Sequence, residues 1–550
     1  MSDELKHECA VAMVVLRKPS SGEGGDFGGT KLSLLMEKQH NRGQDGAGAA
    51  ILAADPEPGE EPYWIAKSAS ATPLVDVLGA IAKRPRPCLS LRERIFLGHL
   101  RYATFGKNDA AFCHPFVHEA SELAHTMLLA GNFNLTNAAD LFADYSRHGS
   151  FPTSRADGYL ICEMIAHELR HRSLADAISA ALANADGAWT LCGATGDGWA
   201  FATRDPNGIR PGYYYMDDEV VVVASERPAI QAAFDVPPEA VKELPPGKAL
   251  TVSPEGEILM AELTSAIKDG SDGGSAQRSC VFEHIYFSRA NDADIHRERK
   301  ALGAALVPQI LAAADAPLED IFFSYIPNSA RIAFHGLLEH LFDGYGKVRF
   351  GEVAVKDAKF RTFIADAAAR REFYKHVYDV TYGLVRPGKD TLVVLDDSIV
   401  RGNTMKNAIL PMLDRLGPKR IVVASSAPPI RYPDCYGIDM STLGELVAFR
   451  ALVNLLGGDA DAELRANPLA SLYARFSDEE HCAEIARLLT PPGMKAEVKV
   501  VYQTIDALHA SCPGSAGDWY FTGDYPTPGG YRVLNKALEN YLERKNERSY

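Results

Sequence analysis

The stretch 391–404, TLVVLDDSIVRGNT, constrains the fold of this chain more than any other part of the sequence. Its apolar run, 392–395, is short, uninterrupted and partly β-branched, as expected of a strand that is buried on both faces. A helical pattern of apolar residues follows over 405–416, and a second apolar run covers 421–424. This order of strand, helix and strand predicts part of a parallel sheet covered by helices.

The loop after the first of these strands has the composition of a site for a phosphorylated sugar. Open α/β sheets bind ligands at the carboxyl ends of their strands, and backbone N–H groups at a helix start suit a phosphate. Asp396 and Asp397 carry the same sign of charge as a phosphate, so they suit ribose hydroxyl groups or a bridging magnesium ion. Acidic loops at helix starts are also common without such a site, so the acidic pair alone is a weak indication.

Length and charge narrow the classes of function. A chain of 550 residues is too long for one core, so we expect two or three domains. The net charge is −15 and no long basic block occurs, so nucleic acid is not an expected partner. No apolar run approaches the roughly 18 residues that span a bilayer, and the first residues, MSDELKHE, lack a signal sequence. We therefore expect a cytoplasmic protein without a membrane partner.

Cys9 precedes an apolar run, 11–16, that we expect to form a strand. The nine cysteines include no CxxC pair, so neither a disulfide framework nor a zinc site is indicated, and most should be buried small residues. Cys9 differs from them if residues 1–8 are removed. It then carries a free α-amine with a reference pKa of about 8, which can act as the general base for its own thiol.

Three further motifs follow, NRGQDGAG at 41–48, GHLRYAT at 98–104 and GNFNLTN at 131–137. Their order and spacing resemble the class II glutamine amidotransferases of the N-terminal nucleophile fold. The string DDSIVRGNT at 396–404 resembles the phosphoribosyl pyrophosphate (PRPP) loop of the type I phosphoribosyltransferases. Together the two halves resemble the amidophosphoribosyltransferase family, which catalyses the first step of purine synthesis.

The resemblance implies a fold and a reaction. The expected fold is an α+β N-terminal nucleophile domain with αββα layers, followed by an α/β type I phosphoribosyltransferase domain with a mainly parallel sheet. The implied reaction converts glutamine, PRPP and water into 5-phosphoribosylamine, glutamate and diphosphate.

The resemblance also implies roles for residues of the glutaminase half. Cys9 is the expected nucleophile, and the Asn132 side chain with the Phe133 backbone N–H is expected to stabilise the oxyanion. Arg101 would pair with the glutamine α-carboxylate, as guanidinium groups do, and Asp157 would hold the α-ammonium group. The full set of expected glutamine-binding residues is Arg42, Arg101, Thr104 and Asp157.

Several positions depart from the family pattern. The family usually has glycine at Ala10, histidine at Gly131, glycine at Phe133 and an acidic residue at Asn328. If Phe133 had to adopt a positive φ, its side chain would carry a steric cost. Taken one at a time, the charged residues Arg42, Arg101 and Asp157 are typical of surface ion pairs, and only their joint occurrence with Cys9 favours a site.

The transferase half offers a second set of residues. The apolar run 321–325 is an expected strand whose exit, 326–329, resembles the family's diphosphate loop, and 356–364 resembles a mobile loop that closes over the substrate. The segment 365–371 also favours a helix, which is compatible with such a loop. Arg361 would neutralise the departing diphosphate. The expected PRPP-binding residues are Lys356, Arg361, Ser398, Arg401, Gly402, Asn403 and Thr404, and the expected magnesium ligands are Ser329, Asp396 and Asp397.

We expect a propeptide at 1–8, a class II glutamine amidotransferase domain at 9–267, a phosphoribosyltransferase domain at 278–450 and a helix-rich C-terminal extension at 451–550. The Gly- and Ser-rich segment 268–275 has the composition of a linker. Mg²⁺ is the expected cofactor. Some family members carry an iron–sulfur cluster, which needs four thiolate ligands. We do not expect a cluster here, because Cys280 is the only cysteine that matches one of the family's ligand positions.

The expected small-molecule partners are glutamine, PRPP and inhibitory purine nucleotides, and family analogy suggests a homo-oligomer, a tetramer. Two alternatives stay open. A sugar-phosphate aminating class II amidotransferase would share the N-terminal half and lack DDSIVRGNT. A non-catalytic or ammonia-only regulatory paralogue would bind PRPP while Ala10, Phe133 and Asn328 disable the chemistry.

Overall fold

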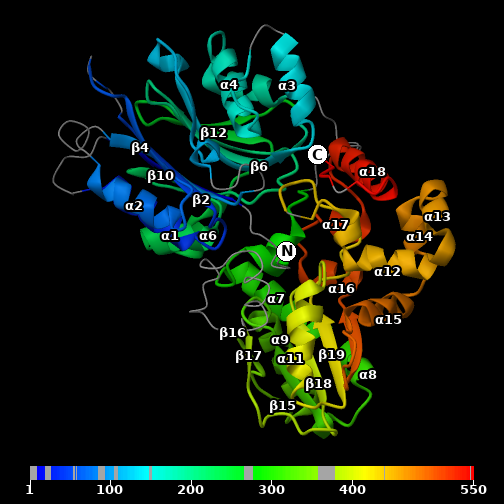
Figure 1. The fold of residues 1–550 in the computed structure, drawn as a ribbon. Coiled ribbons are helices and arrows are strands. Elements are labelled where there is room, and N and C mark those ends of the chain that lie inside the picture. Colours follow the sequence, from blue (N-terminus) through cyan, green and yellow to red (C-terminus); the bar gives the residue numbers. More distant parts are fainter. Residues whose placement is uncertain are drawn as a thin grey trace.

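The computed structural model of the chain has two sheet-containing halves and a group of C-terminal helices along one side (Figure 1). No helix in the part of the chain that the structure describes is both long and apolar enough to cross a membrane. The structure describes residues 9–18, 26–53, 56, 59–84, 93–103, 109–147, 151–265, 277–356, 378–438, 440–545 and 547–549.

The N-terminal half contains two antiparallel sheets that pack face to face. The first has the strand order β11-β9-β10-β1-β4-β2-β3 and the second the order β13-β12-β8-β7-β6-β5. The strands of the first sheet are β1 (Ala10–Leu16), β2 (Gly46–Ala53), β3 (Tyr63–Ser68), β4 (Glu93–Arg101), β9 (Tyr213–Met216), β10 (Val220–Ala224) and β11 (Lys242–Glu243). Those of the second are β5 (Phe116–His118), β6 (Met127–Leu135), β7 (Gly187–Thr195), β8 (Ala200–Arg204), β12 (Lys248–Val252) and β13 (Ile258–Glu262).

Alternation along each strand divides the apolar side chains between two cores. In β1, Val11 and Met13 face the core between the two sheets, whereas Ala12 and Val14 face the helices outside. The run is apolar throughout because both faces of the strand are buried. Helices α1 (Phe27–Lys38), α2 (Pro73–Lys83) and α6 (Arg227–Phe234) cover the first sheet, and α3 (Ala138–Arg147), α4 (Asp157–Leu169) and α5 (Leu174–Leu182) cover the second. The expected αββα arrangement is confirmed.

The transferase half is built on five parallel strands in the order β15-β14-β18-β19-β20. Val393 and Leu395 of β18 face one core, and Leu392 and Val394 face the other. The strands are β14 (Ile321–Tyr325), β15 (Arg349–Phe350), β18 (Thr391–Asp396), β19 (Arg420–Ser425) and β20 (Glu497–Tyr502). The covering helices are α7 (Ala293–Ala305), α8 (Val307–Ala314), α9 (Arg331–Tyr345), α11 (Leu410–Asp414), α12 (Val447–Leu456) and α15 (Asp478–Leu489).

The predicted strand, helix, strand unit is present with one difference. The expected helix starts with a π-helical turn, Met405–Ile409, before α11 begins. Pro411 lies at the start of α11 and has no N–H group, so a regular helical hydrogen bond is missing there. A separate two-stranded ribbon, β16 (Ala354–Lys356) with β17 (Tyr378–Val380), lies beside the sheet.

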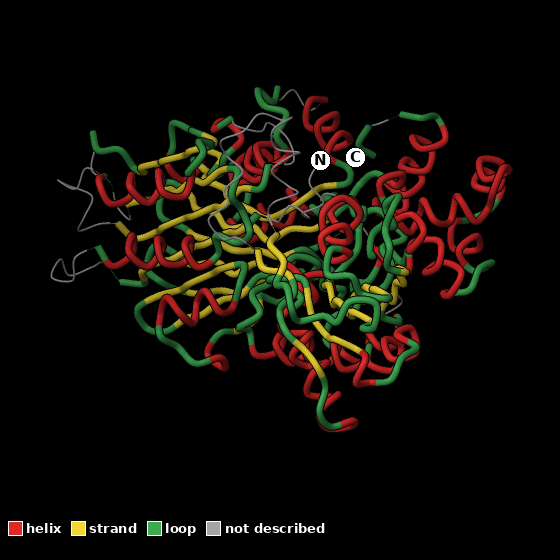
Figure 2. The backbone as a smooth tube through the Cα atoms, turned by 60° about the horizontal axis from the view of Figure 1, so that its bottom comes forward, coloured by secondary structure: helices red, strands yellow, loops and turns green. Residues whose placement is uncertain are grey.

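The structure does not divide the chain at 450 as expected. Helix α12 crosses this position, and β20 pairs in parallel with β19 from Glu497 to Tyr502, so residues beyond 450 complete the transferase sheet. The remaining C-terminal helices pack around Trp519 in a core that also contains Ile209 of the N-terminal half. These helices are α13 (Ala460–Ala466), α14 (Leu469–Tyr473), α16 (Ile505–Ser511), α17 (Trp519–Thr522) and α18 (Pro528–Leu542). In Figure 2 the strands occupy the interior and helices lie around them.

Candidate active sites

Cys9 immediately precedes β1 and lies beside the end of β4. The backbone N–H of Tyr102 donates a hydrogen bond to Cys9 Sγ at 3.4 Å, and the charges of Arg101 and Asp157 both act on the thiol. Burial raises the pKa of the Cys9 thiol to about 11. At neutral pH this thiol is therefore protonated, and its use as a nucleophile requires a base nearby.

Arg101 and Asp157 come from separate elements to the same thiol. Arg101 is the last residue of β4, is buried, and holds its guanidinium 5.8 Å from the ring centroid of Phe112. Asp157 is the first residue of α4, where its carboxylate accepts the Gly158 N–H at 3.0 Å. Burial raises the pKa of Asp157 to about 6. Cys9 thus has a positive and a negative group beside it, which matches the two charged ends of an amino acid.

Asn132 supplies a donor without a partner. Its side chain is buried, and Nδ2 has no hydrogen-bond acceptor among the residues that the structure describes. A buried, unpaired amide is costly unless a ligand or water completes it. Asn132 therefore has the property that an oxyanion donor needs.

The backbone N–H group of Phe133 points away from the neighbouring strand β7. Trp189 faces Phe133 across the ladder, but its N–H donates to Asp205 Oδ2 at 3.2 Å. Gly131, two residues before Phe133, donates its N–H to His114 Nδ1 at 3.1 Å, on the side away from β7. N–H groups two residues apart on a strand point to the same side, so the Phe133 N–H also points away from β7.

The steric cost considered for Phe133 does not arise, because Phe133 lies in the extended strand β6. Among the described residues, those other than glycine with positive φ are Asp235, Asp315 and Arg544. The Phe133 ring occupies the room beside Gly131, where an added Cβ would lie 2.6 Å from Phe133 Cδ1. The large side chain of Phe133 therefore fills the space that the small residue Gly131 leaves, so the two departures from the family pattern compensate each other in volume.

His114 is a residue of this site that the sequence did not reveal. Its ring stacks on Phe133 at 5.6 Å and on His99 at 3.9 Å between centroids. Burial lowers the pKa of His99 to about 3 and that of His114 well below the ordinary value. His114 is therefore neutral and able to accept the Gly131 N–H. The only sequence signal was a histidine before a proline in FCHPF, which is too weak to assign a role.

Arg42 requires a correction. Its guanidinium is buried and donates to Glu226 Oε1 at 2.8 Å and to Glu283 Oε1 at 3.1 Å, so two protein carboxylates already occupy it. We therefore do not retain Arg42 as a glutamine ligand. Thr104 and Arg361 lie outside the described residues, as does the side chain of Lys356 at the end of β16.

The exits of β14 and β18 meet at one edge of the transferase sheet. The Ile326 N–H donates to the Leu395 carbonyl at 2.8 Å, and the hydroxyl groups of Ser329 and Ser398 both hydrogen-bond to Asp397, that of Ser398 at 2.9 Å. The structure therefore brings all three expected magnesium ligands, Ser329, Asp396 and Asp397, to the same place.

The ionised form of Asp396 is destabilised by burial and by the adjacent Asp397. Burial and then the charge of Asp397 raise the pKa of Asp396 well above its ordinary value. Burial also raises the pKa of Asp397, although Ser329, Ser398 and Arg299 oppose the shift. A divalent cation with oxygen preference fits this pair, because it would stabilise both ionised groups.

The loop after Asp397 turns sharply at Gly402. Gly402 has φ = 77°, and an added Cβ would lie 2.2 Å from Leu489 Cδ2. The guanidinium of Arg401 donates to Glu445 Oε2 at 2.7 Å, which ties the loop to the segment before α12. Asn403 and Thr404 then begin the helical turn. The loop thus turns directly into the start of a helical segment, where backbone N–H groups can face an anion.

Cys280 lies in surroundings that do not suit an iron–sulfur cluster. Its Sγ is 2.9 Å from the Tyr520 hydroxyl, inside the aromatic core around Trp519. Burial raises the pKa of the Cys280 thiol to about 12 and that of Cys435, in the same core, well above its ordinary value. A cluster needs four thiolate ligands, whereas the group in contact with Cys280 Sγ is the Tyr520 hydroxyl, and the side chains of this core are mostly aromatic or aliphatic.

Comparison with known proteins finds relatives for both halves. A family model described as a glutamine amidotransferase domain matches residues 111–232. The amidophosphoribosyltransferase of Bacillus subtilis is 31% identical over 472 residues, which cover 83% of this chain and 89% of that protein. The amidophosphoribosyltransferase of Pasteurella multocida is 28% identical over an aligned length of 570 residues, 98% of this chain and 96% of that protein. A solved structure of glutamine PRPP amidotransferase from B. subtilis, complexed with ADP and GMP, matches with a TM-score of 0.68 and 26% identity over 94% of this chain and 97% of that chain.

Proposed function

This chain belongs to the amidophosphoribosyltransferase family, and on that premise we propose that it transfers the amide nitrogen of glutamine to C1 of PRPP. The products are 5-phosphoribosylamine, glutamate and diphosphate. The observation that carries this proposal is that Arg101 and Asp157 both lie close to Cys9. Arg101 suits the α-carboxylate of glutamine, Asp157 suits its α-ammonium group, and Cys9 can attack its amide carbon.

Glutamine cleavage begins with proton transfer from the Cys9 thiol to the α-amine of the same residue, which requires removal of residues 1–8. Sγ attacks the amide carbon, and the oxyanion accepts hydrogen bonds from Asn132 Nδ2 and the Phe133 N–H. The C–N bond breaks, ammonia leaves with the proton, and a thioester remains. Water then hydrolyses the thioester to glutamate and restores the thiol.

The second half-reaction takes place at the exit of β18. Ammonia attacks C1 of the ribose, and the diphosphate leaves with the electron pair of the C1–O bond. The attached nitrogen then loses one proton, to the diphosphate or to water, which gives the amine. The loop 398–404 would hold the 5-phosphate, and Asp396 and Asp397 would hold the ribose hydroxyl groups and, with Ser329, Mg²⁺. Bound Mg²⁺ would stabilise the charge that develops on the diphosphate. Lys356 and Arg361 remain proposed contacts of the leaving group.

The test is an assay of diphosphate release from PRPP, with glutamine or with ammonium as donor, by protein whose N-terminal residue is Cys9. We expect release with both donors in the presence of Mg²⁺. Absence of release with either donor would contradict the proposed reaction. Release with ammonium alone would favour the ammonia-only alternative and would place the defect in the glutamine site.

We also propose that purine nucleotides inhibit this chain and that it assembles as a homotetramer. The nucleotide proposal is supported by the similar B. subtilis structure, which is complexed with ADP and GMP. Family analogy alone supports the tetramer. Inhibition of diphosphate release by GMP and by ADP tests the first, and light scattering coupled to gel filtration tests the second.

A further inference from the structure

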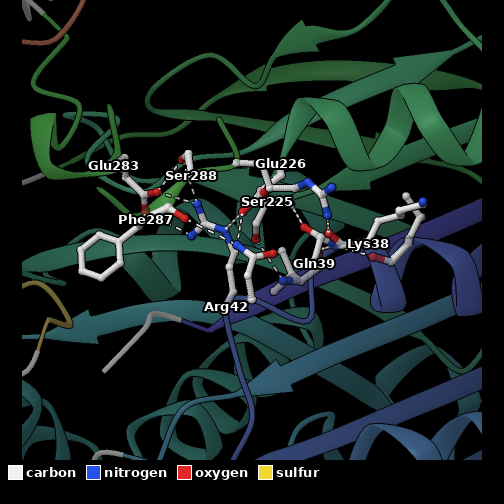
Figure 3. A network of polar contacts seen from close by, with 12 residues as sticks. Lys38, Gln39, Arg42, Ser225, Glu226, Glu283, Phe287 and Ser288 are labelled. Atoms are coloured by element: carbon white, nitrogen blue, oxygen red, sulfur yellow. Dashed lines mark hydrogen bonds and ion pairs between the residues drawn. The ribbon is translucent and has the colours of Figure 1, made fainter. Parts of the chain in front are cut away.

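A buried polar network joins the two halves at a place that the proposed reaction does not use (Figure 3). Its centre is Arg42, which is 1% exposed. Arg42 Nε donates to Glu226 Oε1 at 2.8 Å, and Nη1 donates to Glu283 Oε1 at 3.1 Å. Glu226 follows β10 in the glutaminase half, whereas Glu283 begins the π-helical turn Glu283–Phe287 at the start of the transferase half. One guanidinium therefore binds a carboxylate from each half.

On the glutaminase side the network reaches the strand of the nucleophile. Ser225, the neighbour of Glu226, accepts the Val11 N–H on its Oγ at 3.0 Å. Gln39 Nε2 donates to the Val11 carbonyl at 3.2 Å, and Gln39 Oε1 accepts the Ser225 N–H at 2.9 Å. Val11 is two residues from Cys9 in the sequence. A shift of Glu226 would therefore be transmitted to the backbone that positions Cys9.

On the transferase side the network reaches the acidic pair. Ser288 Oγ donates to Glu283 Oε2 at 2.7 Å, and Arg299 of α7 donates to the Ser288 carbonyl at 2.7 Å. Arg299 Nε also donates to the His284 carbonyl at 2.7 Å. The charge of Arg299 also acts on Asp397. The same arginine thus supports the turn around Glu283 and interacts electrostatically with the loop after β18.

The charges in this network depend on one another. Burial would lower the pKa of Arg42, but Glu283 and Glu226 outweigh it and raise that pKa, so Arg42 stays charged. Burial would raise the pKa of Glu283, but Arg42 and Ser288 lower it. Burial and the charge of Glu283 raise the pKa of Glu226, although Arg42 and Asn41 oppose the shift. Removing Arg42 would leave two buried carboxyl groups, one from each half, without the cation that they share, so the contact between the halves would be lost at a large cost.

We propose that Arg42 is a positioning residue that couples glutamine cleavage at Cys9 to the phosphoribosyl site, by holding the nucleophile strand in a fixed relation to the transferase half through Glu226 and Glu283. The inference rests on the proposed function, because it concerns how the two half-reactions are tied together. Because Glu226 and Glu283 occupy its guanidinium, Arg42 is assigned no contact with either substrate in this proposal. Its loss should therefore separate the two half-reactions without abolishing either.

The experiment measures glutamate and diphosphate in the same reaction mixture, with glutamine and PRPP as substrates. Wild-type protein should form equal amounts of the two products. In Arg42→Met, glutamate should exceed diphosphate several-fold, because ammonia released at a displaced Cys9 escapes. Diphosphate release with ammonium as donor should stay near the wild-type rate. Arg42→Lys keeps the charge and should restore part of the coupling.

Arg84→Met is the matched control. Arg84 is also buried, and its guanidinium donates to Glu93 Oε1 at 2.7 Å and to Asp26 Oδ2 at 2.7 Å. Both partners belong to the glutaminase half, so this variant loses a comparable ion pair within one half. It should lose stability and still form equal amounts of glutamate and diphosphate.

The outcomes separate this inference from the proposed function. If Arg42→Met formed equal amounts of both products, or if Arg84→Met were uncoupled to the same extent, the inference would be overturned. If Arg42→Met does not fold, Glu283→Gln, which removes the charge and keeps an acceptor, decides by the same ratio. Wild-type protein that released no diphosphate with either donor would instead overturn the proposed function.

Discussion

The side-chain amide of Asn134 donates a hydrogen bond of 2.7 Å to the carbonyl oxygen of Cys435. Asn134 lies on β6, the strand that carries Asn132 and Phe133, whereas Cys435 belongs to the transferase half. A second contact of the same kind joins the Arg210 guanidinium to the carbonyl of Tyr436. The strand that we propose to stabilise the oxyanion is therefore held in part by the other half of the molecule.

Asn132→Ala should remove one of the two proposed oxyanion donors. We expect glutamine-dependent kcat to fall by about 10²–10³-fold with little change in the KM for glutamine, since the donor acts on the tetrahedral intermediate. Ammonium-dependent diphosphate release should be unchanged. Asn137→Ala serves as the control, because Asn137 lies in the same motif but its side chain is engaged by the Asn184 carbonyl and the Asp186 N–H. If the rate of diphosphate release fell with glutamine and also with ammonium, the cause would be a folding defect instead.

Cys9→Ala should abolish glutamine-dependent turnover and retain the ammonium-dependent reaction, because only the former needs a thioester. Cys113→Ala is the matched variant, since Cys113 is a buried thiol whose charge would act on Cys9. It should keep both reactions. Intact mass of the active protein should correspond to a chain that begins at Cys9, and full glutaminase activity in a chain that retains residues 1–8 would contradict the role of the α-amine.

The KM for glutamine should depend on pH through Asp157. The pKa of Asp157 is about 6, so below that pH its carboxyl is protonated and cannot hold the α-ammonium group. We expect the KM to rise as the pH falls through about 6, and Asp157→Asn to have a high KM at every pH with this dependence removed. Steady-state kinetics between pH 5 and about 8.5, the range around that pKa, provide the measurement.

The same shift predicts a change in stability. The folded-state pKa of Asp157 lies above its value in the unfolded chain, about 4, so ionisation costs stability as the pH rises from about 4 to 6. Asp157→Asn should therefore raise the free energy of unfolding by roughly 2–3 kcal/mol above pH 7 and have little effect below about pH 4. Denaturant titrations at both pH values test this, and destabilisation at the higher pH would show that the burial of Asp157 is not unfavourable.

Gly402→Ala should weaken PRPP binding and destabilise the protein by about 1–3 kcal/mol, because φ is positive at this residue and the new methyl group would clash with Leu489. Gly458→Ala is the control, since nothing lies within 4 Å of a Cβ placed there and its φ is not positive. The measurements are the KM for PRPP with ammonium as donor and thermal unfolding. Equal effects of the two substitutions would contradict the role of the loop.

A chain that ends after residue 450 should not fold into a stable transferase half, because it lacks β20 and cuts α12 in its first turn. The exposed edge of β19 would then offer unpaired backbone groups. A chain that ends after residue 542 keeps every strand and should stay folded. Yield of folded protein and circular dichroism compare the two, and a stable chain of 450 residues would restore the boundary expected from the sequence.

Local pattern was sufficient to predict the elements that carry the chemistry. The strands that became β1, β14, β18 and β19 are short apolar runs, and their burial on both faces explains why the runs could be recognised. The C-terminal segment could not be assigned in this way. Its strand β20 begins with Glu497 and contains Lys499, so the run lacks the continuous apolar character of its neighbours.

The sequence by itself determined the two-part organisation and the acidic pair with its loop, and it was sufficient to propose Cys9 as the nucleophile with Arg101 and Asp157 beside it, because these depend on residue types in fixed local order. Only the tertiary structure decided which residues Arg42 and Phe133 contact. Arg42 meets Glu226 and Glu283 from distant parts of the chain, and the Phe133 ring fills space left by Gly131 beside His114. Such pairings depend on which side chains share a buried volume. The order of residues along one strand or loop does not contain that information.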